Sequence, residues 1–406
     1  MNAPQKLALQ IKLPTADRRM EPYTLSVPRD FPTQQTQGFN RVAFAAAHVV
    51  ADSLSPKEPW VEAGVDWDRT IAFRRHLWAL GFGVAEAMDT AQRGMGLDWA
   101  NSLELIRRSI DAARDVPGAF LASGAGTDHL EPGPKVTVAD VIAAYEQQFA
   151  AVEQAGGRII MMASRALAAC TKSPDDYYRV YTKLLQQARE PVIIHWLGEM
   201  FDPALAGYWG YADHYKAMEV ALTVIQANAA KVDGVKVSLL DKQKEIDMRR
   251  RLPRGGGGGP SAPPRGVRMY TGDDFNYAEL IEGDGEGYSD ALLGIFDAIA
   301  PAASGALAAL ARGDRKRFHE ILAPTVPLSR HIFGAPTRFY KTGVVFLAWL
   351  NGHQEHFVMV GGQQSARHVL HLAEAFRLAD RAGLLRDPEL ACRRMRELLA
   401  VNGLEG

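Results

Sequence analysis

A strand followed by a helix recurs along most of this chain. Short apolar runs bounded by turn residues alternate with amphipathic segments from residue 41 to residue 289. Eight parallel strands separated by helices, over about 250 residues, are typical of a closed (β/α)8 TIM barrel rather than an open sheet. We predict strands at 41–47, 82–87, 119–123, 158–163, 192–196, 234–241, 267–271 and 286–289.

We place the predicted barrel at residues 41–313. One segment precedes it, one follows it, and a third is inserted within it. Residues 1–40 predict a short N-terminal hairpin, and the helical pattern of residues 314–406 predicts a C-terminal helical extension packed against the barrel. Residues 254–265 contain five consecutive glycines and three prolines, which predict a flexible insertion. No Gly-Lys-Ser/Thr follows these glycines, so a phosphate-binding loop is not favoured.

Charge and cysteine content exclude several classes of protein. The chain has 46 Lys and Arg against 47 Asp and Glu, which gives no support for a nucleic-acid or membrane-surface partner. Cys170 and Cys392 lie far apart and form no metal-ligand motif, so a reduced, cytoplasmic protein is expected. We find neither a signal-peptide pattern nor an apolar run long enough to span a bilayer.

One predicted strand carries a lysine in an unusual setting. In the segment 234–241, Lys236 shares a face with Gly234 and Ser238, because side chains alternate along a strand. Burial lowers the pKa of an ammonium group, and an uncharged lysine is a nucleophile that can form a Schiff base with a carbonyl. A lysine on an edge strand, or one that extends to water, would have the same local sequence.

Polar residues occur at or just after the ends of the predicted strands, where a barrel of this type holds its active site. Each residue type is ordinary by itself, and the shared position is what indicates a site. These residues are His48, Asp89, Thr90, Ser123, Ser164, Arg165, His195, Asp273, Asp274 and, beside the eighth strand, Ser289.

Three stretches in barrel order carry a resemblance to a known family. They are Gly-Val-Lys-Val at 234–237, Gly-Asp-Asp at 272–274 with the glycine-rich 282–289, and Ser-Gly-Ala-Gly-Thr at 123–127. Over roughly residues 40–330 the chain resembles a divergent branch of the dihydrodipicolinate synthase and N-acetylneuraminate lyase superfamily of class I aldolases. The resemblance implies that Lys236 forms a Schiff base, that no metal or organic cofactor is needed, and that the protein is a homo-oligomer, a dimer or tetramer.

The chain also departs from the family pattern. Met-Asp-Thr-Ala-Gln at 88–92 replaces the family's Gly-Thr-Thr-Gly-Glu turn, which holds a substrate carboxylate. Asp89 therefore places a negative charge where that carboxylate would lie. His195 stands where the family has a proton-relaying tyrosine, and 163–166 lacks the family's Tyr-Tyr pair.

The resulting hypothesis is a class I aldolase or lyase acting on a small carbonyl compound. Lys236 would attack the carbonyl, and His195 would move protons with help from Thr90. The expected substrate-binding residues are Asp89, Ser123, Ser164, Arg165 and Asp273. Two alternatives remain open. One is a non-catalytic barrel that binds a small molecule; the other is a metal-assisted lyase or hydrolase using His48, Glu86, Asp89 and His195.

Overall fold

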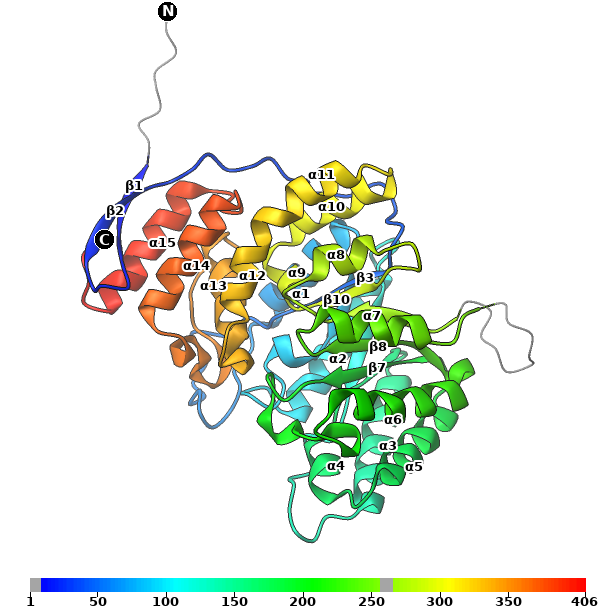
Figure 1. The fold of residues 1–406 in the computed structure, drawn as a ribbon. Coiled ribbons are helices and arrows are strands. Elements are labelled where there is room, and N and C mark those ends of the chain that lie inside the picture. Colours follow the sequence, from blue (N-terminus) through cyan, green and yellow to red (C-terminus); the bar gives the residue numbers. More distant parts are fainter. Residues whose placement is uncertain (1–8, 256–265) are drawn as a thin grey trace, which may run out of the picture.

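The computed structural model describes residues 9–255 and 266–406. Eight parallel strands close into a barrel in the order β10-β3-β4-β5-β6-β7-β8-β9, which confirms the predicted (β/α)8 architecture (Figure 1). The predicted insertion at 254–265 falls between α7 and β9, and its residues 256–265 lie outside the described residues. The strands are β3 (Ala43–Ala46), β4 (Gly83–Glu86), β5 (Leu121–Ala125), β6 (Ile159–Met161), β7 (Val192–Leu197), β8 (Val232–Ser238), β9 (Arg268–Thr271) and β10 (Asp290–Leu293).

Helices connect and surround these strands. Side chains that share one strand face fill the barrel interior, among them Phe44, Ile160, Ile193, Tyr270 and Leu292. The opposite strand faces pack on the helices, as expected for a sheet that is buried on both sides. The main helices are α1 (Trp67–Ala79), α2 (Trp99–Arg114), α3 (Val138–Gln154), α4 (Arg165–Cys170), α5 (Pro174–Gln187), α6 (His214–Ala227), α7 (Lys242–Arg251), α8 (Tyr277–Glu282), α9 (Ile295–Ala298) and α10 (Ala300–Ala311).

The eighth strand was predicted at the wrong place. Residues 286–289 lie in and after a tight turn, in which the Asp284 carboxylate accepts hydrogen bonds from the backbone N–H groups of Glu286 and Gly287. The strand is instead Asp290–Leu293, whose apolar residues fill the barrel wall. Ser289 therefore precedes the strand, at the end of the barrel opposite the active-site end.

Ser289 donates a hydrogen bond to a buried carboxyl group there. Its hydroxyl donates to Glu245 Oε1 of α7 at 2.7 Å, and burial raises the pKa of Glu245 to about 8. In the unfolded chain Glu245 releases its proton near its ordinary pKa of 4.5. In the folded protein it keeps the proton to a higher pH. Its contribution to stability is therefore present below pH 4.5 and is lost as the pH rises to about 8.

Glu245→Gln should remove this pH dependence. Between pH 4.5 and 8, we expect the wild-type free energy of unfolding to fall relative to that of the variant. The total change should be on the order of a few kcal/mol. Urea unfolding across this range measures the difference. Glu286→Gln, at an exposed position in the neighbouring turn, should leave the wild-type profile intact; parallel profiles for wild type and Glu245→Gln would show that Glu245 titrates normally.

The C-terminal extension packs beside the barrel, and its Tyr340 contacts Thr90 after β4. It contains α11 (Arg315–Leu322), α12 (Val326–Ile332), α13 (Tyr340–Leu350), α14 (Val369–Arg381) and α15 (Pro388–Val401). Every residue of α13 is buried, so this helix is the core of the extension. In Figure 1 the orange and red helices of the extension stand together on one side of the barrel. No helix in the described part of the chain is both long and apolar enough to cross a membrane.

The N-terminal hairpin docks on this extension rather than on the barrel. Strands β1 (Gln10–Pro14) and β2 (Met20–Thr24) pair antiparallel and lie against α14 and α15 (Figure 1). Asp380 of α14, which is buried, accepts hydrogen bonds from the Tyr23 hydroxyl at 2.7 Å and from the Ser26 N–H at 3.1 Å. These bonds join the two ends of the chain.

Asp380→Ala should detach the hairpin. The change leaves the Tyr23 hydroxyl and the Ser26 N–H without their acceptor, at a cost of about 1–3 kcal/mol. We expect faster proteolytic cleavage within residues 9–40 and a lower urea midpoint. Glu397→Ala, which removes an exposed carboxylate from α15, should change neither result; unchanged cleavage in Asp380→Ala would show that other contacts hold the hairpin.

Candidate active site at the barrel mouth

Lys236 lies on the inner face of β8. It is level with His195 of β7 and Tyr270 of β9 in the barrel register, and only 7% of its surface is exposed. Its neighbours on the same face are Gly234 and Ser238, as the alternation predicted. The side chain is therefore inside the ring of strands and not among the surrounding helices.

Two glycines make room for this arrangement. A methyl group at Gly272 would lie 2.9 Å from Lys236 Cε and 2.3 Å from Ser238 Oγ, closer than packed atoms approach. A methyl group at Gly234 would lie 2.5 Å from the Tyr270 ring. Glycine at these two positions lets the lysine and the tyrosine ring occupy the same narrow interior.

The Lys236 amine is buried without a partner. Its Nζ makes no hydrogen bond or ion pair with any residue in 9–255 or 266–406. Burial lowers the pKa of Lys236 from its ordinary value, and the nearby carboxylates of Asp89 and Asp274 only partly oppose this. The uncharged, nucleophilic form of the amine is therefore easier to reach than in an exposed lysine.

The two adjacent aspartates after β9 have different roles. The carboxylate of Asp273 accepts hydrogen bonds from the N–H groups of Phe275 and Asn276, at 2.8 and 3.1 Å, and so shapes the turn before α8. Asp274 is the one that faces Lys236; its Oδ1 accepts from the Ile295 N–H at 2.9 Å. Burial raises the pKa of Asp274 to about 7, so this carboxyl group can hold a proton near neutral pH.

His195 presents a neutral imidazole beside the lysine. Its Nε2 lies 3.2 Å from the Ser238 hydroxyl, while Nδ1 has no hydrogen-bond partner within the described residues. Burial, reinforced by Lys236, holds the pKa of His195 well below its usual range. The ring lines a cavity of about 230 Å³ together with Asp89 and Arg165. A neutral imidazole at a cavity wall can accept a proton from a bound molecule.

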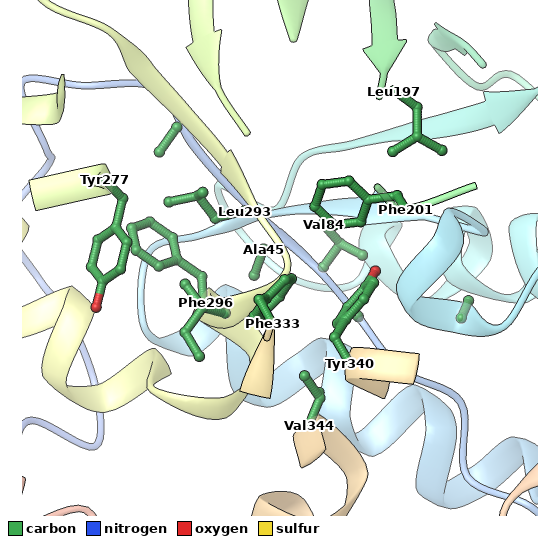
Figure 2. Packing of buried hydrophobic residues seen from close by; sticks show 14 of the residues in the cluster. Ala45, Val84, Leu197, Phe201, Tyr277, Leu293, Phe296, Phe333, Tyr340 and Val344 are labelled. Atoms are coloured by element: carbon green, nitrogen blue, oxygen red, sulfur yellow. The ribbon is translucent and has the colours of Figure 1, made fainter. Parts of the chain in front are cut away.

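Thr90 connects the barrel to the extension. It belongs to the short 3₁₀ turn η1 (Asp89–Ala91) after β4, and its hydroxyl lies 2.8 Å from the Tyr340 hydroxyl. Tyr340 is the first residue of α13, and its ring stacks on Phe333 at 4.3 Å and meets Phe201 edge-on at 6.0 Å (Figure 2). Burial and the nearby Asp89 raise the pKa of Tyr340, so the phenol keeps its proton.

Of the two predicted serines, Ser123 faces away from the barrel interior and Ser164 is bound to other groups. Ser123 lies inside β5 and not after it, because the strand runs two residues further than predicted. Its neighbour Ala122 faces the barrel interior, so Ser123 faces the helices. Ser164 is the N-cap of α4; its Oγ accepts from the Leu167 N–H at 2.9 Å and lies 2.6 Å from the Thr127 hydroxyl. The expected position of Ser123 is thereby corrected.

Arg165 lies at the rim of the mouth. Its Nε donates to Asp202 Oδ2 at 2.5 Å, and its side chain remains about two-fifths exposed, at 43%. It lines the same cavity as His195, so it can meet a group that enters from outside.

The side chains considered for a metal site do not lie together. Glu86 points away from the interior and pairs with Arg74 and the Ser109 hydroxyl, while His48 pairs with Asp297 at 2.7 Å. In residues 9–255 and 266–406, no three His, Cys, Asp or Glu side chains are grouped to share a metal ion.

The family and fold comparisons agree with this architecture. A family model described as "Protein of unknown function (DUF993)" matches residues 11–404. The chain belongs to this family. None of the curated protein sequences compared with the chain matches it.

Solved structures of the dihydrodipicolinate synthase family share the fold. YagE from E. coli K12, a prophage protein of that family crystallised with pyruvate, matches with a TM-score of 0.63 and 12% identity, covering 85% of this chain and 99% of its own. The Aquifex aeolicus dihydrodipicolinate synthase matches at 0.56 and 13% identity, covering 90% and 99%. The 4-hydroxy-tetrahydrodipicolinate synthase of Methylacidiphilum fumariolicum SolV matches at 0.60 and 11%, covering 86% and 99%. The resemblance inferred from the sequence is confirmed for the fold.

Strained backbone also occurs at this end of the barrel. Ala87, directly after β4, and Leu240, two residues after β8, both have φ of 51°, which is unfavourable for residues with a side chain. Such strain persists only where the surrounding structure enforces it, and it concentrates at functional sites. The loop after Ala87 carries Asp89 and Thr90 of the candidate site.

Proposed function

We propose that this protein is a carbon–carbon lyase or aldolase that forms a Schiff base between Lys236 and a small carbonyl substrate. The observation that carries the proposal is a buried, unpartnered amine inside the barrel, next to a neutral histidine that lines a cavity. The fold shared with dihydrodipicolinate synthases supports it. Cytoplasmic location and homo-oligomeric assembly stay predictions from the sequence.

Formation of the Schiff base needs a nucleophile and an acid. Lys236 Nζ would attack the carbonyl carbon and give a carbinolamine, whose hydroxyl leaves as water when it receives a proton. Asp274, with a pKa of about 7 and facing the lysine, is suited to supply that proton. The product is an iminium cation, which nearby Asp89 would stabilise.

The iminium cation would then accept electrons from a neighbouring carbon–carbon bond. In the cleavage direction, a hydroxyl on the second carbon loses its proton to a base, the bond breaks, and an aldehyde and an enamine result. His195 is the base that the geometry favours, since its ring is neutral and lines the cavity. The Thr90 and Tyr340 hydroxyls would return a proton to the enamine carbon, and water would release the second product.

Borohydride trapping tests the proposal. A panel of aldehydes, ketones and oxo acids is incubated with the full chain and reduced, and the peptides are analysed by mass spectrometry. We expect a stable secondary amine on the peptide that contains Lys236, at a stoichiometry near one and before any adduct on exposed lysines. Failure of every member of the panel to label Lys236 would overturn the proposal.

A further inference from the structure

A cavity of about 380 Å³ lies between the N-terminal segment, the barrel and the extension. Its walls come from residues 28–33, from α1, α9 and α10, and from α13 and the loops that follow α13 and α14. Within the described residues, it shares no lining residue with the cavity that contains His195. Its volume equals that of about twelve water molecules in the liquid and is within the range of small-molecule sites.

Two buried polar atoms belong to side chains that line this cavity. His76 Nε2 of α1 and Asp297 Oδ1 of α9 make no hydrogen bond with any residue in 9–255 or 266–406. The other oxygen of Asp297 accepts from the His48 N–H and lies 2.7 Å from His48 Nδ1. Buried polar groups are nearly always hydrogen-bonded, so two such atoms at one cavity indicate that a molecule in the cavity completes their bonds.

The charges around the cavity favour an uncharged ligand. Burial, reinforced by Arg386, lowers the pKa of His76 to about 4, and burial holds the pKa of His353 well below its usual range, so both imidazoles are neutral. Their ring centroids lie 4.6 Å apart. The formal charges of the other lining residues cancel, because they come from two arginines and two aspartates, Arg29, Arg386, Asp30 and Asp297. A charged ligand would lose its hydration on entry and meet no excess of the opposite charge.

Much of the remaining wall is apolar. It includes side chains from the N-terminal segment, α10, α13 and the loop after α14, namely Phe31, Pro32, Pro301, Leu347 and Leu384. A ligand that buries apolar surface here gains affinity from the hydrophobic effect. A hydroxyl suits its polar end, because a hydroxyl can donate to Asp297 Oδ1 and accept from the N–H tautomer of His76 Nε2.

We propose that this cavity binds a small, uncharged molecule with an apolar body and a hydroxyl end, and that the bound molecule holds residues 28–33 against the barrel and the extension. In that segment the Arg29 N–H donates to the Gly383 carbonyl at 3.2 Å, and the ligand adds apolar contacts with Phe31 and Pro32. A ligand that binds only the folded chain stabilises it by mass action. The inference is independent of the proposed function, because neither Lys236 nor His195 lines this cavity.

Four probes of similar shape test the inference on the full chain: phenylpropanol, propylbenzene, phenylpropionate and phenylpropylamine. Binding is measured by saturation-transfer NMR and by the shift of the thermal unfolding midpoint. We expect phenylpropanol to bind with a Kd about tenfold lower than that of each other probe, and to slow proteolytic cleavage within residues 9–40. Absence of phenylpropanol binding, or equal or tighter binding of any other probe, would overturn the inference.

Variants locate the site. Ala298→Phe, at a half-buried position in the cavity wall, should fill the cavity and weaken phenylpropanol binding by about tenfold or more. His76→Phe keeps a ring but removes Nε2, so it should bring the Kd values of phenylpropanol and propylbenzene together. Ala400→Phe, at an exposed position on α15, should leave binding unchanged. Undiminished phenylpropanol binding in both Ala298→Phe and His76→Phe would place the bound molecule elsewhere and overturn the inference.

Discussion

Replacing Lys236 by methionine is expected to abolish adduct formation and to lower turnover of any substrate by roughly 10⁴-fold or more, because the covalent route is removed. The same variant should be more stable than the wild type near neutral pH. The wild-type chain must bury an amine that has no partner, whereas methionine fills a similar volume without a charge to desolvate. Loss of function with a gain in stability marks a residue kept for chemistry.

The pH dependence of that gain separates a functional lysine from a structural one. The unfolded chain holds its proton up to about pH 10.5, and folded Lys236 releases it earlier. Wild-type stability should therefore rise toward that of Lys236→Met as the pH approaches 10.5. Lys216→Met, at an exposed position on α6, should change neither adduct nor stability. A large loss of stability in Lys236→Met would contradict the account.

The second large effect is expected at the buried Arg74–Glu86 pair. Arg74 Nε and NH2 donate to the two oxygens of Glu86 at 2.9 and 2.8 Å, and both side chains are fully buried. Arg74 also donates to the His48 carbonyl, and Glu86 accepts from the Ala87 N–H. The pair thus joins α1 to β4 and to the loop that carries Asp89. Arg74→Met strands a buried carboxylate and should cost about 3–5 kcal/mol.

A double variant tests the reason for this cost. In Arg74→Met combined with Glu86→Leu no charge is left unpaired, so much of the lost stability should return. The urea midpoints of the wild type, both single variants and the double variant give the coupling between the two side chains. Additive losses would show that the pair acts through packing alone.

Local sequence patterns predicted the barrel and the orientation of Lys236. Alternation of Val235 and Val237 with Lys236 fixes which face the lysine occupies, whatever the exact strand ends are. The prediction for Ser123 was wrong. The strand was predicted to end at residue 123 but continues to Ala125, so Ser123 lies within the strand and not at its end. The eighth strand was misplaced because a glycine-rich turn at 284–287 precedes a run of only four residues.

Long-range contacts account for what the sequence did not reveal. Tyr340 comes from the extension, and no local pattern indicates that α13 begins beside Thr90. Asp273 and Asp274 are adjacent in sequence, and only the turn geometry decides which carboxylate faces the amine. The aromatic residues around Phe333 could have indicated that a helix end is packed there, but not which part of the barrel it contacts.

The most direct test of the central claim is the pKa of the Lys236 amine, measured by NMR titration of lysine side chains labelled at Cε. The signal of Lys236 is assigned by its absence from Lys236→Met. We expect a Lys236 signal that titrates clearly below the ordinary 10.5. A Lys236 signal that titrates at or above 10.5 would mean a paired, charged lysine and would contradict the account.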